Sequence, residues 1–169
     1  YVNGLPLVVI EAKRPDATHV GQAMVDEGIS QQLRNQRPDE IPQLFAYAQL
    51  LLAVSHTDGR YGTTGTPMKF WARWREEQFS DAQLSDWKNR PLSADAEATL
   101  LAGKPAKLQT YFRQLWAQPL LPTDQDRLLA ALLHPQRLLE YLRLFVLFDR
   151  KAGKVVARYQ QFFGIRALL

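Results

Sequence analysis

The feature that most restricts the fold of this chain is a short apolar run near its beginning. Residues 5–13 read LPLVVIEAK, with three β-branched side chains in succession before a glutamate and a lysine. Such a run, followed by charged residues and a proline, predicts a strand that is buried on at least one face. Side chains alternate along a strand, so Glu11 and Lys13 share the face of Leu7 and Val9, where the strand ends.

The dipeptide Asn3-Gly4 precedes this strand and is the strongest short signal for a two-residue hairpin turn. It predicts that another strand, largely absent from the sequence, precedes Leu5 and pairs antiparallel with it. The chain also lacks an initiator Met and ends on apolar residues. We therefore expect it to be a fragment of a longer protein.

The rest of the first half alternates between helical and strand patterns. The expected elements are a helix over residues 20–36, a short helix over 39–47, an apolar strand at 50–55, a turn at 56–59 and a returning strand at 60–64. This order predicts an α/β fold with helices around a mixed sheet. The aromatic and basic residues 70–74 favour a cover over a sheet edge more than a nucleic-acid stacking surface.

The second half is mostly helical in pattern. Residues 85–105 are interpreted as a polar connector, because Pro91, Gly103 and Pro105 interrupt them. Helices are then expected at 107–118, 124–133 and 135–148, where apolar residues recur at helical spacing between prolines.

Composition excludes several classes of protein and site. The chain contains no cysteine, which rules out disulfides, cysteine nucleophiles and thiolate metal sites. No apolar run approaches the roughly 18 residues of a membrane helix, and no signal segment opens the chain. With 46% hydrophobic and 22% charged residues, the composition is that of a globular domain, and a cytoplasmic location is expected.

Glu11 and Lys13 are the candidate chemical groups. A carboxylate suits Mg²⁺, because a hard cation prefers oxygen ligands, and the backbone carbonyl of Ala12 can add another oxygen. The metal would activate a water for phosphodiester hydrolysis, while a neighbouring lysine orients that water or stabilises the phosphorane. The spacing Glu-x-Lys also arises by chance, so a surface ion pair is the alternative interpretation.

The strand and its surroundings resemble a known family. Residues 3–13, the stretch 41–55, the segment 61–71 and, more loosely, residues 158–163 are similar to the R (restriction) subunit of type I restriction-modification enzymes. The nuclease region of that subunit belongs to the PD-(D/E)xK superfamily. The resemblance implies a restriction-endonuclease-like mixed sheet flanked by helices, followed by a mostly helical C-terminal segment.

The resemblance also implies roles for particular residues. Glu11 would be the acidic metal ligand, with the Ala12 carbonyl beside it, and Lys13 the catalytic lysine. The family has a Q-x-x-x-Y element on the following helix. Gln31 would be its first residue and would complete the catalytic set.

The register of that element stays open, because neither choice supplies the tyrosine. Gln31 is followed at the fourth position by Asn35, whereas Gln32 is followed by Gln36. We favour Gln31. The residues expected to bind DNA are Lys13, Arg14, Gln31, Arg34 and Asn35.

The family places a further aspartate on the strand before the Asn3-Gly4 turn, upstream of Tyr1. Asp16 and Asp26 are the nearest acids in the chain, and neither matches that position. We therefore expect the fragment alone to be inactive. The expected organisation is a truncated nuclease core at 1–90, a helical segment at 91–148 and a connector at 149–169 into an ATP-dependent helicase motor.

In that connector, Gln160 and Gln161 resemble a glutamine that reads the adenine of ATP in the parent protein. An amide suits this task because it donates and accepts at one base edge. The chain itself has no phosphate-binding loop of the Walker type, so ATP is expected in the full-length protein only. An interface helix with Tyr159 and Phe162 in the core is an equally good interpretation.

The expected function is that of a type I site-specific deoxyribonuclease, which uses Mg²⁺ to cut DNA in an ATP-driven complex. The implied partners are double-stranded DNA and the modification and specificity subunits, with no membrane. Two alternatives stay open. One is another PD-(D/E)xK nuclease of repair or recombination, and the other is a non-catalytic DNA-binding or assembly module.

Overall fold

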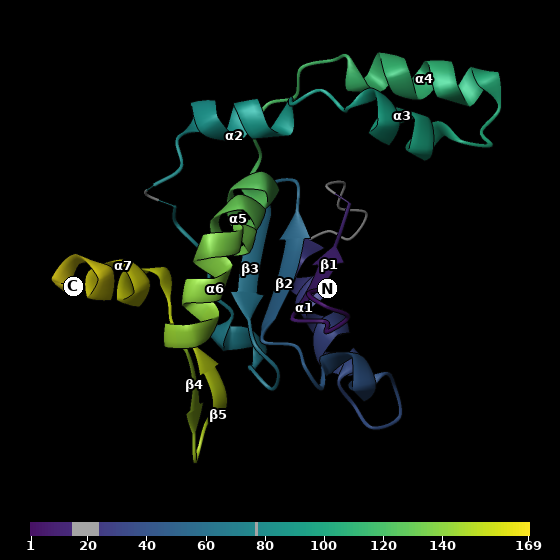
Figure 1. Cartoon of the computed structure of the whole chain (residues 1–169). Helices are drawn as coiled ribbons and strands as arrows, with labels where there is room; N and C mark the ends of the chain where they lie inside the picture. The colour runs from purple at the N-terminus through teal and green to yellow at the C-terminus, as the bar shows by residue number, and fades with distance from the viewer. Residues whose placement is uncertain (15–23, 77) are drawn as a thin grey trace. The chain divides into compact units, whose positions relative to one another are not determined.

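A computed structural model describes residues 1–14, 24–76 and 78–169, and its contacts divide the chain into two compact units (Figure 1). The first unit comprises residues 1–78 and 123–169, and the second comprises residues 79–122. The domain boundaries expected near residues 90 and 148 stay predictions. The expectations for residues 15–23, including Asp16, lie outside the described residues.

The first unit is built on a three-stranded mixed sheet in the order β1-β2-β3. Its strands are β1 (Val8–Ala12), β2 (Leu50–Ser55) and β3 (Asp58–Gly62). β1 pairs with β2 in parallel and β2 with β3 antiparallel. Helix α1 (Met24–Asn35) and the short 3-10 turn η1 (Pro42–Phe45) connect β1 to β2. The predicted α/β class with a mixed sheet and a mostly helical C-terminal part is confirmed.

The central strand β2 is buried along its whole length, and its alternating side chains enter two different cores. Leu51 and Ala53 face α1, where Val25, Ile29, Phe45, Ala48 and Trp71 complete one cluster. Leu50, Leu52 and Val54 face the other side. There they pack with Tyr61 and with residues of α5 (Asp124–Leu133), α6 (Pro135–Leu144) and α7 (Tyr159–Leu168).

The Asn3-Gly4 turn forms as predicted. Both residues have positive φ, 48° and 80°, and Val2 and Leu5 form an antiparallel bridge with two backbone hydrogen bonds. Glycine and asparagine tolerate this left-handed conformation, which is why the dipeptide signals a hairpin. The paired segment is a single bridge at Leu5, and β1 itself begins at Val8.

The turn between β2 and β3 is shorter than predicted, because Asp58 and Gly59 belong to the returning strand. Gly59 faces α5, where a Cβ would lie 2.8 Å from Leu128 Cδ2 and 3.2 Å from Leu128 Cβ. The glycine that suggested a turn is therefore required by close packing of helix against strand.

The aromatic segment at residues 70–74 covers a sheet edge, as predicted. It follows the 3-10 turn η2 (Met68–Phe70), and Ala72 forms an antiparallel bridge with Tyr61 of β3. Trp71 is buried in the cluster under α1, and Trp74 is buried in the cluster on the opposite face.

The prediction of a polar connector at 85–105 was wrong. The second unit contains α2 (Asp81–Lys88), α3 (Ala94–Leu101) and α4 (Ala106–Trp116). Ser80 and Gln83 form a capping box at the start of α2, and Ser93 caps α3 through the N–H of Ala96. These side chains satisfy the first backbone donors, so the short helices form despite the intervening prolines.

The helix predicted at 135–148 ends at Leu144, and its last four residues were wrongly assigned. Strand β4 (Val146–Asp149) pairs antiparallel with β5 (Gly153–Val156). Asp149 Oδ1 accepts hydrogen bonds from the N–H groups of Lys151 and Ala152, and Gly153 takes a positive φ of 73°. This local turn chemistry ends the helix and reverses the chain.

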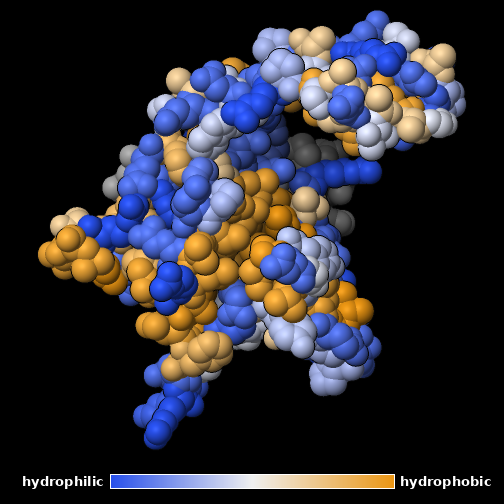
Figure 2. Space-filling view, in the orientation of Figure 1, coloured by the Kyte–Doolittle hydropathy of each residue, from blue (hydrophilic) through white to orange (hydrophobic). Residues whose placement is uncertain are grey.

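Apolar side chains are also exposed on the first unit. Figure 2 shows hydrophobic surface over α6, α7 and the base of the β4–β5 hairpin, whose projecting tip is hydrophilic. Exposed apolar residues of these elements include Leu139, Leu144, Leu147 and Ile165. Among the described residues, no helix has the length and apolar character needed to cross a membrane.

Candidate functional site

Glu11 and Lys13 lie at the carboxyl end of β1, beside the central strand. Glu11 pairs with Ala53 in the parallel register, and the backbone N–H of Lys13 donates to the carbonyl of Val54 at 2.8 Å. The ladder therefore continues one residue beyond β1 and holds Lys13 in place. Both side chains point to the face covered by α1, as their alternation predicts.

Helix α1 approaches this pair closely at Gly28. A Cβ placed on Gly28 would lie 3.4 Å from Ala53 Cβ and 3.5 Å from the Cγ atoms of both Glu11 and Lys13. Val25 and Ile29 are buried on the same side of the helix and anchor it against the sheet. The helix is thus near enough for its polar side chains to reach Lys13.

The Lys13 ammonium is surrounded by three oxygen acceptors. Lys13 Nζ donates to Gln31 Oε1 at 2.6 Å, and it lies 3.3 Å from Glu11 Oε1 and 3.4 Å from Glu27 Oε1. The exposed fractions of the side chains rise from 14% for Lys13 to 23% for Glu11 and 47% for Glu27. The lysine is therefore mostly buried, while the two glutamates, Glu27 above all, are accessible to solvent.

The two glutamines left open by the sequence have different surroundings. Gln31 contacts Lys13, whereas Gln32 is buried and donates to the carbonyls of Val9 and Leu52 at 3.3 and 2.8 Å. The amide oxygen of Gln32 is buried without a hydrogen-bond partner among the described residues. Gln32 thus ties α1 to the backbone of β1 and β2.

The other residues expected at DNA are Arg14, Arg34 and Asn35, which are close to the cluster in sequence. Arg34 and Asn35 follow Gln31 at helical spacings of three and four, so they share its side of α1. Arg34 is half-exposed, with Nε 3.8 Å from Glu40 Oε1. Arg14 is exposed directly after Lys13.

Glu27 was missed in the sequence analysis, although a signal for it existed. Glu27 and Gln31 are four residues apart on one helix, so both face the same neighbour. The expectation that Gln31 lies beside Lys13 therefore also predicts that the Glu27 carboxylate lies there.

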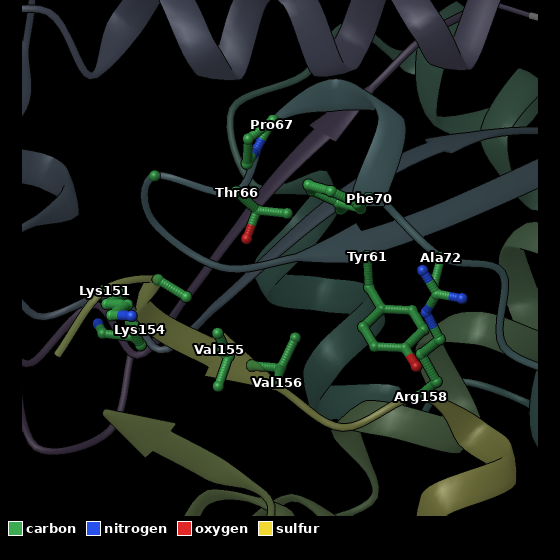
Figure 3. Close-up of a pocket in the computed structure, with 12 residues that line it drawn as sticks. Tyr61, Thr66, Pro67, Phe70, Ala72, Lys151, Lys154, Val155, Val156 and Arg158 are labelled. Atoms are coloured by element: carbon green, nitrogen blue, oxygen red, sulfur yellow. The ribbon is translucent and has the colours of Figure 1, made fainter. Parts of the chain in front are cut away.

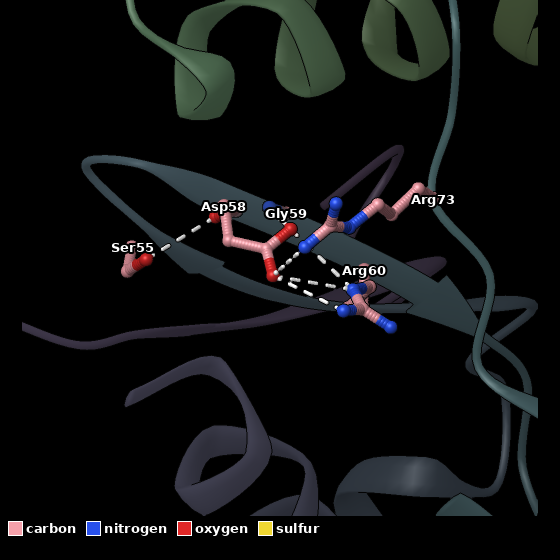
Figure 4. A network of polar contacts seen from close by, with 5 residues as sticks. All are labelled: Ser55, Asp58, Gly59, Arg60 and Arg73. Atoms are coloured by element: carbon pink, nitrogen blue, oxygen red, sulfur yellow. Dashed lines mark hydrogen bonds and ion pairs between the residues drawn. The ribbon is translucent and has the colours of Figure 1, made fainter. Parts of the chain in front are cut away.

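A second polar group, also missed, lies on the same sheet (Figure 4). The Asp58 carboxylate of β3 accepts from Arg60 Nη2 at 3.2 Å and from Arg73 Nη2 at 2.9 Å. It also accepts from the N–H of Gly59 at 2.8 Å. Burial alone would raise the pKa of the Asp58 carboxyl, but hydrogen bonds and charges from the two arginines outweigh it and lower this pKa.

The donor set around Lys13 is compatible with a hard cation. Glu11 and Glu27 approach the same ammonium, and Mg²⁺ is commonly bound by one or two carboxylates together with waters and substrate phosphates. Within the part of the chain that the structure describes, no three His, Asp or Glu residues gather as a metal cluster. Among the described residues, the site therefore offers two carboxylates and backbone carbonyls, and no closed metal cage.

A cavity of about 490 Å³ lies elsewhere on the first unit (Figure 3). It lies between the 65–72 segment and β5, with Tyr61 and Phe70 facing Val155 and Val156. Lys154 lines it and donates from Nζ to the carbonyl of Ala48 at 2.7 Å, and burial lowers the pKa of this lysine. None of the residues predicted for catalysis lines this cavity.

The two glutamines predicted for adenine lie at the start of α7. The side-chain oxygen of Gln161 accepts from the backbone N–H of Arg158 at 2.8 Å, so this amide caps the helix. Gln160 is exposed, whereas Phe162 is fully buried in the core. Phe162 lies in the core and Tyr159 packs against it partly buried, as the alternative interpretation placed them, while the adenine role and the interface role stay predictions.

Comparisons with known proteins agree with the resemblance read from the sequence. Residues 1–70 match the family described as Type I restriction enzyme R protein N terminus. Over 171 aligned residues the chain is 30% identical to the type I restriction enzyme HindI endonuclease subunit of Haemophilus influenzae. The alignment covers 98% of this chain and 12% of that protein. It is 24% identical over 167 residues to the putative type I restriction enzyme MjaIXP endonuclease subunit of Methanocaldococcus jannaschii, covering 98% of this chain and 13% of the relative. The chain thus spans about an eighth of the length of these curated relatives.

Proposed function

Residues 1–70 belong to the family of type I restriction enzyme R protein N termini, and from this premise we propose that the chain is the DNA-cleaving region of an R subunit. Its reaction would be Mg²⁺-dependent hydrolysis of DNA phosphodiester bonds, without sequence preference of its own. One observation carries the proposal: a lysine, a carboxylate and a glutamine meet at the end of β1, with the lysine 3.3 Å from Glu11 and 2.6 Å from Gln31.

Lys13, Gln31 and Glu27 have distinct roles in this proposal. The Lys13 ammonium can orient the attacking water or stabilise negative charge that develops on the phosphoryl oxygens. Gln31 accepts a hydrogen bond from Lys13 and so restricts the position of its charge. Glu27 provides a more exposed second carboxylate at 3.4 Å, which keeps the ammonium near the opening of the site.

Glu11 would hold the metal ion together with the Ala12 carbonyl, and Glu27 is a further carboxylate beside the same lysine. When bound, Mg²⁺ supplies activation of a water and neutralisation of charge on the phosphate. It needs few protein ligands, because it keeps several waters and takes oxygens from the substrate.

The DNA backbone would run along the carboxyl end of β1. Arg14 follows Lys13 directly and Arg34 follows Gln31 by three residues, and both are exposed cations, while Asn35 shares the helix side of Gln31. Positive and amide side chains of this kind bind phosphates and position a duplex without reading its sequence. Recognition of a site would then belong to a specificity subunit, and methylation to a modification subunit.

ATP belongs to the proposed whole protein and not to these residues. The Gln161 amide oxygen already caps α7, and the sequence has no Walker-type phosphate loop. ATP-driven translocation would therefore be supplied by a motor elsewhere in the R subunit.

The proposal is tested by Glu11→Gln in the full-length R subunit, assembled with its modification and specificity subunits. We expect cleavage of a supercoiled plasmid carrying the recognition site to fall about 10²–10³-fold, the range for losing a group that stabilises transition-state charge. Glu97→Gln is the matched control, because Glu97 pairs with Arg113 in the unit of residues 79–122. Cleavage and ATP hydrolysis should both be unchanged in the control.

Two results would contradict the proposal. Wild-type cleavage by Glu11→Gln would remove the catalytic assignment. A wild-type complex that never cuts, yet binds duplex with a steep dependence on salt, would favour a non-catalytic DNA-binding module.

A further inference from the structure

The register of the sheet places Arg60 in line with the candidate site. Glu11 of β1 pairs with Ala53 of β2, and Ala53 pairs with Arg60 of β3. Directly paired residues project to the same face, so Glu11 and Arg60 point the same way. Ala53 lies between them, and Gly28 of α1 packs over it, where an added Cβ would be 3.4 Å from Ala53 Cβ. Two strand spacings separate their backbones, about 10 Å.

The next position along the strands continues this alignment. Ala12 pairs with Val54, which places Lys13 beside Ser55, and Ser55 pairs with Asp58. The Arg60–Asp58–Arg73 group and the Glu11–Lys13 pair are therefore two polar groups on one face, near the same end of the sheet. Arg73 reaches Asp58 from the segment that follows η2 (Figure 4).

This group has more positive charge than its own ion pairs neutralise. One carboxylate, Asp58, serves two guanidinium groups, so the trio has a formal charge of +1. The Arg73 side chain is 63% exposed, and its contact with Asp58 uses a single nitrogen, Nη2. A guanidinium has five N–H donors, so most of those on Arg73 face away from Asp58.

Asp58 is itself fixed by the backbone. It accepts from the N–H of Gly59 and from both Nε and Nη2 of Arg60, and its side chain is mostly buried. A guanidinium held on a fixed carboxylate loses little further freedom when it binds an anion, which favours phosphate recognition.

We infer that Arg60 and Arg73 form a second phosphate-binding site, which anchors the DNA backbone next to the phosphate held at Glu11 and Lys13. This inference rests on the proposed function and extends it to residues outside the Glu11–Lys13–Gln31 set. Duplex DNA carries one phosphate per about 1.7 Å of axis, so about six phosphates lie within 10 Å of axis. A duplex at the first site therefore brings other phosphates near the arginines. Asp58 acts as a positioning residue for them.

The test is duplex binding by the 169-residue chain without divalent metal, titrated over a series of NaCl concentrations. For the Arg60→Ala/Arg73→Ala double variant we expect about tenfold weaker binding at moderate salt. The slope of log K against log salt should fall by about 0.9 for each phosphate that the variant no longer neutralises. A variant with Arg60→Ala and Arg73→Lys keeps the charge at position 73 and should bind more tightly than the double alanine variant.

Arg113→Ala is the matched control. Arg113 is 51% exposed and also pairs with one carboxylate, that of Glu97, but it lies in the unit of residues 79–122. Its removal should change neither affinity nor slope. Because Arg73 is largely exposed, Arg73→Ala alone tests the inference if the double variant does not fold, with an expected loss of about threefold.

The outcomes separate this inference from the proposed function. Affinity and slope equal to those of Arg113→Ala would overturn the inference, while the Glu11→Gln cleavage assay would still decide the nuclease proposal. A wild-type chain that binds no duplex at any salt concentration would overturn the phosphate site. In that case a cleaving full-length complex would leave the nuclease proposal standing.

Discussion

The two faces of the β1-β2-β3 sheet each hold a cation beside glutamate, but in opposite settings. Under α1, Lys13 contacts Glu11 and Glu27 at an acidic rim that solvent reaches. On the other face, Arg137 of α6 lies 3.1 Å from Glu76, and their side chains are only 4% and 3% exposed. The first pair is accessible to solvent, whereas the second is enclosed.

The enclosed pair is satisfied by protein groups alone. Glu76 accepts from Trp74 Nε1 at 2.8 Å and from the N–H of Gln78 at 2.7 Å, while Arg137 also donates to the Gln78 side chain. The Arg137 guanidinium lies 4.9 Å from the centre of the Phe162 ring. Burial alone would raise the pKa of Glu76, but these hydrogen bonds and the arginine charge lower it.

This difference is the basis on which we assign the Arg137–Glu76 pair to the fold and propose the Lys13–Glu11 pair for chemistry. A buried pair with every oxygen engaged holds α6, α7 and the Trp74 segment together and leaves no position for a substrate. In the proposed function, the hydrated carboxylates would exchange their contact with Lys13 for a metal ion, and the lysine would contact a phosphate.

Arg137→Ala should have the largest effect on stability. It leaves the Glu76 carboxylate buried without its cation, which costs about 3–5 kcal/mol of unfolding free energy. Urea denaturation of the chain measures this loss, and Arg113→Ala should change stability by no more than about 0.5 kcal/mol. A loss below about 1 kcal/mol for Arg137→Ala would mean that the enclosed pair does not hold this face together.

Substitutions of Gly59 and Gly28 test how tightly a helix packs against each face of the sheet. Gly59→Ala would push a Cβ to 2.8 Å from Leu128 Cδ2 and should destabilise by about 1–3 kcal/mol. Gly28→Ala meets Ala53, Glu11 and Lys13 at 3.4–3.5 Å, which is ordinary contact. Its better helix propensity should leave stability unchanged or raise it by up to about 1 kcal/mol.

The same urea experiment measures both glycine variants. If Gly28→Ala were the more damaging of the two, α1 would be packed as tightly as α5. The interpretation of the Lys13 face as the more open one would then be wrong.

The sequence was informative where one pattern excluded its rivals. The strand at 50–55 and the helix at 124–133 were predicted with the observed bounds, because a continuous apolar run and a proline-bounded helical stripe each allow one structure. The pairing of Glu11 with Lys13 on one face followed from the two-residue period of a strand. These inferences needed no knowledge of distant residues.

The failures occurred where tertiary partners or side-chain caps decide the structure. Residues 145–148 suit either a helix or a strand, and the turn at Asp149 and Gly153 selects the strand. The arginines around Asp58 come from β3 and from a segment beyond η2, so only the folded sheet brings them together. Likewise, nothing local in the sequence pairs Glu76 with Arg137, which lie 61 residues apart.

The most direct test of the central claim is Lys13→Met, studied for both stability and cleavage. Glu11 and Glu27 stay hydrated without the lysine, so the unfolding free energy should change by no more than about 1 kcal/mol. Plasmid cleavage by the assembled full-length enzyme should fall at least about 10²-fold. Retained cleavage, or a loss of stability as large as that of Arg137→Ala, would contradict the assignment of Lys13 to chemistry.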